Sequence, residues 1–146
     1  MNIQFVVYGD PVPKGRPRFF RKGKFVGTYT PKETEIAERD FKFQSIKHKP
    51  ANLLAGAIVL DVKVFRKMPK SMSKKNRILA EIGSLRPVTK PDADNYAKLV
   101  CDAMNGIFWG DDSQIVKLTV EKLFSERPRI DVTLTNEEFL KEILHG

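Results

Sequence analysis

The sequence contains one cysteine, Cys101, and two histidines in 146 residues. A single cysteine excludes an intramolecular disulfide and a cysteine-based zinc site, and His48 and His145 belong to no motif, so we expect both on the surface. No apolar run approaches the ~20 residues of a membrane span. Residues 1–4 lack the charged-then-apolar pattern of a signal peptide, and a Walker-type phosphate loop is missing. We therefore expect a cytoplasmic protein with no membrane contact and no nucleotide cofactor.

Positive charge, in contrast, is abundant. Twenty-six Lys and Arg residues against eighteen Asp and Glu give a net charge of +8 and a pI near 9.6. Residues 1–90 hold twenty basic and seven acidic side chains, whereas residues 91–146 hold six basic and eleven acidic ones. Such an excess favours a polyanionic partner, most often nucleic acid. The acidic residues gathered in the second part need a separate explanation.

The basic residues are densest near the N-terminus, in an extended loop or irregular hairpin rich in Pro and Gly. Six cations lie within eleven residues: Lys14, Arg16, Arg18, Arg21, Lys22 and Lys24. Loops of this kind suit contact with phosphates, so we predict that these side chains bind nucleic acid. For the interleaved rings of Phe19, Phe20 and Phe25 we favour burial in the core over stacking on bases. Residues 66–77 form a second, weaker basic candidate.

Apolar and β-branched residues predict four strands, over residues 3–8, 56–65, 115–124 and 129–134. The last two strands are expected to pair with each other around Arg127 and Pro128. Combined with three predicted helices, the strands indicate one α+β domain over residues 1–146. Its architecture is a two-layer sandwich with a mixed, mostly antiparallel sheet.

The first helix is predicted over residues 31–47, with Thr30 as its N-cap and Pro31 as its first residue. Its inward stripe is expected to contain Ile36 and Phe43, with Phe41 or Ile46. The second helix is short, capped by Ser73 and closed by Gly83. A further short helix is expected after Asn136.

The third helix begins at Asp92 and ends at Asn105–Gly106, two residues that tolerate the left-handed conformation. At about 100° per residue, Asp94 and Lys98 fall on one face together with Asp102. The opposite face is apolar and consists of Tyr96, Leu99, Val100, Ala103 and Met104. This helix therefore presents charge on one side and anchors the other side in the core.

The carboxylates around this helix have two interpretations. Asp92 alone would be a helix cap, Asp94 with Lys98 a surface pair, and Asp111–Asp112 a turn. Together, the same carboxylates could converge on one Mg²⁺ or Mn²⁺, which prefer carboxylate oxygens, water and substrate phosphates. In a basic chain, such a site would serve phosphodiester hydrolysis, with a nearby lysine stabilising the developing charge. The residues alone leave both interpretations open.

The stretch from Lys90 to Ile115 resembles the RusA-type Holliday-junction resolvases, endodeoxyribonucleases of phages and prophages. The shared pattern, K-P-D-x-D-N-x-x-K-x-x-x-D-A-x-N-G-x-x-W-x-D-D-x-Q-I, is present without a gap. The N-terminal stretch is also similar to the family, through Gly9-x-Pro11-x-Pro13-Lys14-Gly15-Arg16-Pro17-Arg18 and the later Tyr29-Thr30-Pro31. The resemblance covers residues 3 to about 134, and a motif of about a dozen fixed positions is highly specific.

The resemblance implies that Asp92, Asp94 and Asp112 bind Mg²⁺ or Mn²⁺ and that Lys98 is the catalytic lysine. Of the acidic pair, we take Asp112 rather than Asp111. Lys90 joins the basic stretch as a predicted DNA contact. The family is homodimeric and nicks two opposed strands of a four-way DNA junction, with one complete site in each protomer. Trp109 is expected to pack beneath the acidic turn, and Cys101 is not expected to be a nucleophile.

We therefore predict a structure-selective, metal-dependent endodeoxyribonuclease that resolves Holliday junctions in DNA recombination and repair. Two alternatives remain at this point. One is a related metal nuclease that cuts flaps or simple duplex, and the other is a DNA-binding module whose carboxylates serve only as caps and surface pairs. RNA binding is a more distant third possibility.

Overall fold

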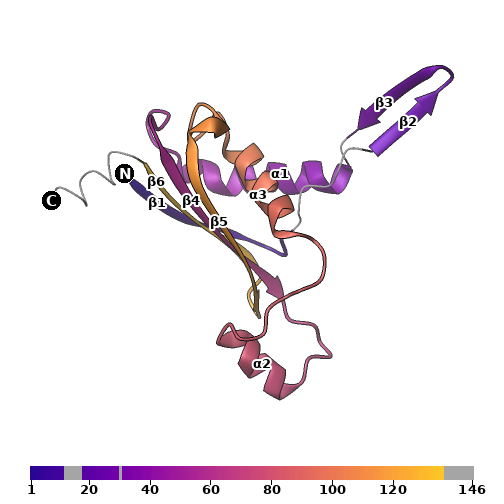
Figure 1. The fold of residues 1–146 in the computed structure, drawn as a ribbon, viewed down its shortest axis with the longest axis vertical. Helices are drawn as coiled ribbons and strands as arrows, with labels where there is room; N and C mark the ends of the chain where they lie inside the picture. The colour runs from indigo at the N-terminus through magenta and orange to yellow at the C-terminus, as the bar shows by residue number, and fades with distance from the viewer. Residues whose placement is uncertain (12–17, 30, 137–146) are drawn as a thin grey trace.

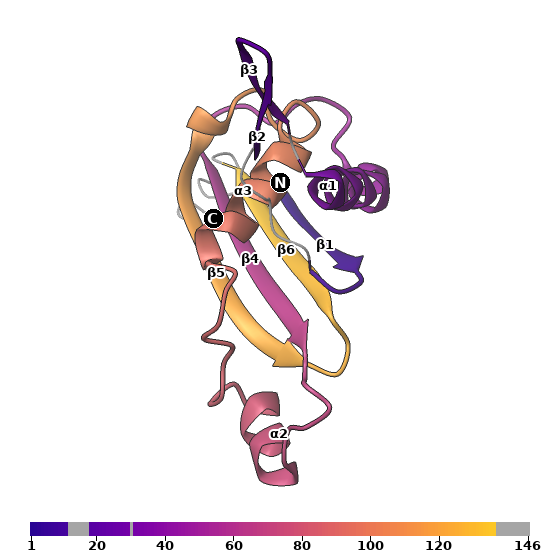
Figure 2. The ribbon, with the colours of Figure 1, turned by 90° about the vertical axis from the view of Figure 1, so that its right-hand side faces the viewer.

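The computed structural model describes residues 1–11, 18–29 and 31–136. Four strands form a mixed sheet in the order β1-β6-β4-β5, and a separate two-stranded sheet is made by β2 and β3. Helices α1 and α3 cover one face of the larger sheet (Figures 1 and 2). With three α-helices and a mostly antiparallel main sheet, the structure confirms the predicted α+β class. No helix of the described part is long and apolar enough to cross a bilayer.

The four strands of the main sheet are β1 (Asn2–Tyr8), β4 (Ile58–Lys67), β5 (Ile115–Ser125) and β6 (Arg129–Asn136). Along β4, every second residue from Ile58 to Val64 is fully buried, and β6 alternates in the same way. Period-two alternation of this kind places one face of a sheet on the core and leaves the other face outside. The buried face points toward α1 and α3.

The predicted pairing of the last two strands is wrong, because β4 lies between them. Strand β5 runs parallel to β4, and β6 runs antiparallel to it. The link from Ser125 to Arg129 must therefore pass the end of β4, across two strand spacings of about 5 Å each. Four peptide steps reach about 13 Å, so the short link suffices. A Pro within a short link indicates a turn but does not distinguish a hairpin from this crossing.

Helix α1 (Lys32–Ser45), followed by a 3₁₀ turn (Ile46–His48), begins one residue later than expected, with Pro31 in the N-cap position. Its predicted cap, Thr30, lies outside the described residues. The predicted inward face is wrong in part: Phe41 is 1% exposed, whereas Phe43 is 79% exposed and Ile36 is also exposed. The buried face includes two hydroxyl residues, Thr34 and Ser45. When the buried face of a helix is inferred from its apolar residues alone, positions such as these are assigned to solvent, which explains the error.

Two elements project from the sheet-and-helix body, at different ends of it (Figure 1). One is the hairpin of β2 (Arg18–Lys22) and β3 (Phe25–Tyr29), whose phenylalanines are exposed rather than buried in the core as predicted. The other contains α2 (Lys74–Glu81), capped as predicted by Ser73, whose side chain accepts a hydrogen bond from Asn76 N at 3.2 Å.

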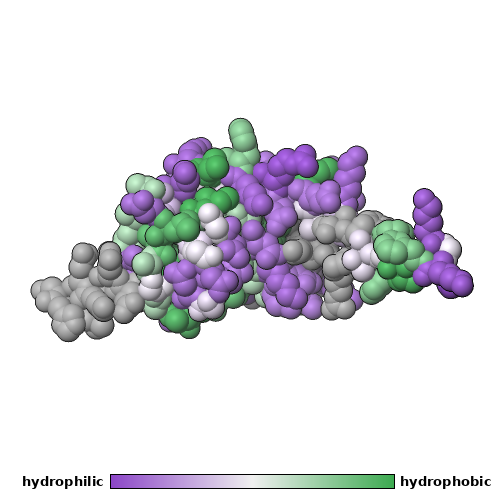
Figure 3. Space-filling model, turned by 90° about the horizontal axis from the view of Figure 1, so that it is seen from above, coloured by the Kyte–Doolittle hydropathy of each residue, from purple (hydrophilic) through white to green (hydrophobic). Residues whose placement is uncertain are grey.

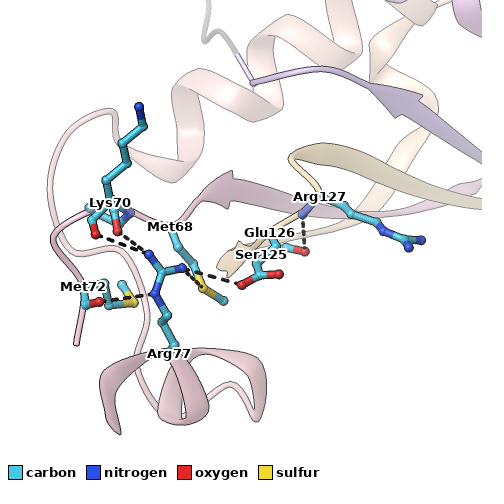
Figure 4. A network of polar contacts seen from close by, with 8 residues as sticks. Met68, Lys70, Met72, Arg77, Ser125, Glu126 and Arg127 are labelled. Carbon is cyan, nitrogen blue, oxygen red and sulfur yellow. Dashed lines mark hydrogen bonds and ion pairs between the residues drawn. The ribbon is translucent and has the colours of Figure 1, made fainter. Parts of the chain in front are cut away.

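The α2 projection is held in place by Arg77 (Figure 4). Its guanidinium donates to the carbonyl oxygens of Met72 and Pro69, both at 3.2 Å, and lies 3.6 Å from the Glu126 carboxylate. These contacts join the start of α2 to the loop before it and to the end of β5. Arg77 therefore fixes the position of the α2 projection, a basic segment that packs little against the core.

Helix α1 supplies a direct test of which face is inside. Phe41→Ala should lower the free energy of unfolding by about 3–5 kcal/mol, because a buried ring is removed. Phe43→Ala, on the exposed face of the same helix, should change it by less than about 0.5 kcal/mol. Urea denaturation of both variants measures the difference. Equal losses would contradict this orientation of α1.

Candidate metal and DNA site

The connector before α3 is fastened to the sheet by cationic side chains. Lys122 Nζ donates to the Thr89 carbonyl at 2.8 Å, and Arg66 Nη1 donates to the Lys90 carbonyl at 3.2 Å. Arg86 forms an ion pair with Glu121 at 3.0 Å in the same connector. Lys90 and Pro91 are joined by a cis peptide bond. The chain therefore enters α3 from a position set by β4 and β5.

Helix α3 (Ala93–Met104) has the amphipathic arrangement that its sequence predicts. Its apolar face is buried, with six side chains inside: Tyr96, Ala97, Leu99, Val100, Ala103 and Met104. Asp92 occupies the N-cap position, as predicted, but its side chain accepts no capping hydrogen bond. The carboxylate of Asp92 and the neighbouring Asp94 are both exposed at the positive end of the helix dipole.

Lys98 lies one turn further along the exposed face of α3. Among the described residues, no ion pair joins it to Asp94, so the surface pair of the purely structural interpretation is not formed. Both side chains remain in solvent on the face that α3 turns away from the core. This exposed charge is available to a ligand.

The turn after α3 is anchored in the core. The helix ends at Asn105–Gly106 as predicted: Asn105 has an extended backbone, and Gly106 takes the left-handed conformation, with a φ of 78°. Trp109 is fully buried, and its backbone bridges to Leu54 and Asn105. Gln114 Nε2 donates to the Leu54 carbonyl at 2.9 Å. The acidic turn is therefore held between α3 and the segment that leads into β4.

The two carboxylates of this turn have different partners. Asp111 caps the 3₁₀ turn Asp112–Gln114 by accepting hydrogen bonds from the Ser113 backbone N–H, at 3.1 Å, and from the Ser113 hydroxyl. Both bonds lower the pKa of Asp111, and the bond from the Ser113 hydroxyl has the larger effect. Asp112 Oδ1 instead accepts the indole N–H of Trp109 at 2.8 Å. Trp109 thus packs beneath the turn, as predicted, and orients Asp112.

Cys101 lies on α3, about 10 Å from Asp94 along the helix axis. The pKa of this thiol is raised to about 11, first by burial and then by the negative charges of Asp112 and Asp102. A thiol with so high a pKa agrees with the expectation that Cys101 is no nucleophile.

The predicted metal ligands fall into two groups in this structure. Asp92 and Asp94 lie at the start of α3, and Asp112 lies in the 3₁₀ turn that follows the helix. Within residues 1–11, 18–29 and 31–136, no three His, Cys, Asp or Glu side chains gather closely enough to hold a metal ion together. Mg²⁺ is commonly held by one or two carboxylates, with water and substrate phosphates completing its shell. The exposed Asp92–Asp94 pair fits that chemistry, and convergence of all three carboxylates stays a prediction.

The predicted DNA contacts are exposed wherever the structure describes them. Four of them lie on the β2–β3 hairpin: Arg18, Arg21, Lys22 and Lys24. Lys90 is exposed beside the start of α3. Lys14 and Arg16 lie outside the described residues. The structure thus places basic side chains both on a projecting hairpin and next to the carboxylate pair.

The side chains that hold the connector before α3 in place were not predicted from the sequence. Arg66 and Lys122 lie in strands and act through tertiary contacts, for which the sequence carries no local signal. His48 was expected on the surface, but its ring is half-buried and stacks on Phe5, with centroids 5.3 Å apart. The hydroxyl of Tyr96 is buried beneath the start of α3 and, among the described residues, has no hydrogen-bond partner.

Comparisons with known proteins agree with the family that the sequence motif indicates. The family model "Endodeoxyribonuclease RusA" matches residues 8–135, which places the chain in the endodeoxyribonuclease class. The chain belongs to this RusA endodeoxyribonuclease family, as its motif indicated. It is also 46% identical over 135 residues to "Uncharacterized protein YqaN" of Bacillus subtilis (strain 168), covering 90% of this chain and 94% of that protein.

The proximity of Asp112 to Cys101 can be tested through thiol chemistry. Asp112→Asn removes a negative charge that disfavours the thiolate, so the pKa of Cys101 should fall and its alkylation by iodoacetamide at a fixed alkaline pH should accelerate. Asp94→Asn is the control and should leave the rate unchanged. An equal rate in the Asp112 variant and the wild type would contradict this placement.

Proposed function

We propose that this protein is a homodimeric, metal-dependent endonuclease that resolves Holliday junctions by paired nicks in opposed strands, during DNA recombination and repair in the cytoplasm. The observation that carries the proposal is the exposed carboxylate pair at the start of α3, in a chain of the RusA family. Asp92 makes no capping bond, and Asp94 makes no ion pair with Lys98. Among the described residues, these two carboxylates make neither contact, and what they contribute to the fold is the favourable position of negative charge at a helix N-terminus.

In the proposed site, Asp92 and Asp94 hold Mg²⁺ or Mn²⁺, with Asp112 as the third ligand. The bound ion would polarise the scissile phosphate and activate water for attack. Lys98 stands one helical turn from Asp94, where its ammonium can neutralise charge that develops on the phosphate. Trp109 fixes the orientation of Asp112 through the indole N–H, and Asp111 keeps the turn closed by bonding to Ser113.

The basic residues supply the DNA contacts in this proposal. The hairpin cations and Lys90 neutralise backbone phosphates, which favours binding and makes it sensitive to salt. A homodimer brings two such sites to one junction, as a pair of opposed nicks requires.

Loss of either carboxylate at the start of α3 should separate cutting from binding. Asp92→Asn and Asp94→Asn should each lower Mg²⁺-dependent cleavage of a four-way junction by about two orders of magnitude or more, because a metal ligand is lost. Junction binding, measured by gel shift without metal, should persist. Asp111→Asn is the matched control, since Asn also serves as a cap. Cleavage at the wild-type rate by the Asp94 variant would contradict the assigned site.

Substrate choice separates the proposal from its alternatives. We expect the wild type in Mg²⁺ to cut a four-way junction faster than a flap, and a flap faster than linear duplex. Equal rates on all three substrates would indicate a metal nuclease of different selectivity. Binding without metal-dependent cutting, and without thermal stabilisation by Mn²⁺, would indicate a DNA-binding module. Preference for RNA over junction DNA in competition would indicate the third alternative.

A further inference from the structure

The β2–β3 hairpin exposes an unusual amount of aromatic surface. Phe19, Phe20 and Phe25 are 77%, 42% and 62% exposed, and Val26 beside them is 61% exposed. Figure 1 shows the hairpin projecting away from the body, and Figure 3 shows hydrophobic and hydrophilic side chains together at that end of the molecule. Exposed apolar side chains gathered on a projection mark a surface that binds something.

The register of the hairpin sorts these side chains onto two faces. Residues paired across a hairpin share a face, and the face alternates along each strand. Phe20 pairs with Gly27 and Lys22 pairs with Phe25, so both rings lie on the same face, with Arg18 and Lys22 beside them. The rings of Phe20 and Phe25 contact each other, with centroids 6.0 Å apart and planes inclined by 54°.

Gly27 makes this arrangement possible. A Cβ atom at residue 27 would lie 2.6 Å from Cζ of Phe20 and 3.1 Å from Cε1 of Phe25. The ring of Phe20 therefore lies directly over the backbone of the opposite strand, in the space that a side chain would occupy. The aromatic pair is thus positioned before any partner binds, which lowers the entropic cost of binding.

The charge of the hairpin identifies the kind of partner. Residues 18–29 contain four cations and no acidic residue. A second copy of the hairpin would bring like charges together, and a basic or neutral apolar partner would leave the cations unpaired. Single-stranded nucleic acid satisfies both features, since its bases stack on aromatic rings while its phosphates contact Lys and Arg.

We propose that the hairpin is a base-stacking finger, in which Phe20 and Phe25 contact unpaired bases at the branch point of the DNA while Arg18 and Lys22 contact the adjoining phosphates. The proposal rests on branched DNA being the substrate, and it adds a stacking surface that is separate from the carboxylate site. It assigns the hairpin to recognition of opened strands rather than to bond cleavage.

The test uses the full-length protein and two double variants on the same hairpin. Phe20→Leu with Phe25→Leu keeps the apolar bulk but removes the stacking surface, and Phe19→Leu with Val26→Leu changes the opposite face as a control. Binding to an oligothymidine strand and to linear duplex is measured in EDTA, where no cutting occurs. A four-way junction with 2-aminopurine at the branch point reports base unstacking by fluorescence.

We expect the Phe20/Phe25 variant to bind oligothymidine about tenfold more weakly or worse, by loss of base stacking. Its duplex affinity should stay within about twofold of the wild type, because the cations are unchanged. The 2-aminopurine signal should fall in this variant and persist in the control. Unchanged oligothymidine binding, or equal losses in both variants, would overturn the proposal.

Gly27→Ala gives an independent test, because it leaves both rings in the chain but displaces Phe20 from its place. It should weaken oligothymidine binding and should leave the melting temperature of the body unchanged, and wild-type binding would contradict the preformed pair. Failure of junction cutting by the wild type would overturn the proposed function without affecting these binding measurements. The two proposals can therefore fail separately.

Discussion

The seating of α3 on the sheet is the constraint on which the candidate site depends. Half of its twelve residues are buried against the β-strands and α1, so rotation of the helix would bring charged side chains into the core. Burying an unpaired carboxylate or ammonium costs several kcal/mol even after relaxation. The apolar face thus dictates that Asp94 and Lys98 face outward together. Their exposure is a consequence of packing and requires no specific contact between them.

Both ends of α3 are fixed by additional contacts of different kinds. At its start, Arg66 and Lys122 bind carbonyl oxygens of the connector, so cations of the sheet set the position of Asp92 through the backbone. At its end, the buried ring of Trp109 holds the acidic turn against the core and binds Asp112. The backbone that carries the carboxylates is therefore held in place at both ends of α3, an arrangement that suits a ligand site.

The sequence predicted which helices and strands form better than it predicted which of them lie next to each other. Helix α3, with its apolar face, and the class of the fold followed from local periodicity, and the motif indicated the family. The order of β5 and β6 did not follow, because β4 inserts between them through contacts remote in the sequence. The inward face of α1 was missed because Thr34 and Ser45 are buried there. The hairpin phenylalanines were predicted to be buried because phenylalanine is buried in most proteins. A projecting hairpin has no core to receive them.

The same distinction applies to the site. The residue types predicted a set of hard oxygen ligands, and the structure has two of these residues at the start of α3 and the third in the turn after the helix. An acidic pair in a basic chain has a further electrostatic consequence. In the proposed complex, DNA phosphates near Lys90 would be repelled by Asp92 and Asp94 unless a cation lay between them, since like charges a few ångströms apart repel by about 1 kcal/mol or more even in water. A divalent cation at this pair would therefore serve the binding of the scissile phosphate as well as its hydrolysis, and the remaining basic residues would hold the rest of the strand.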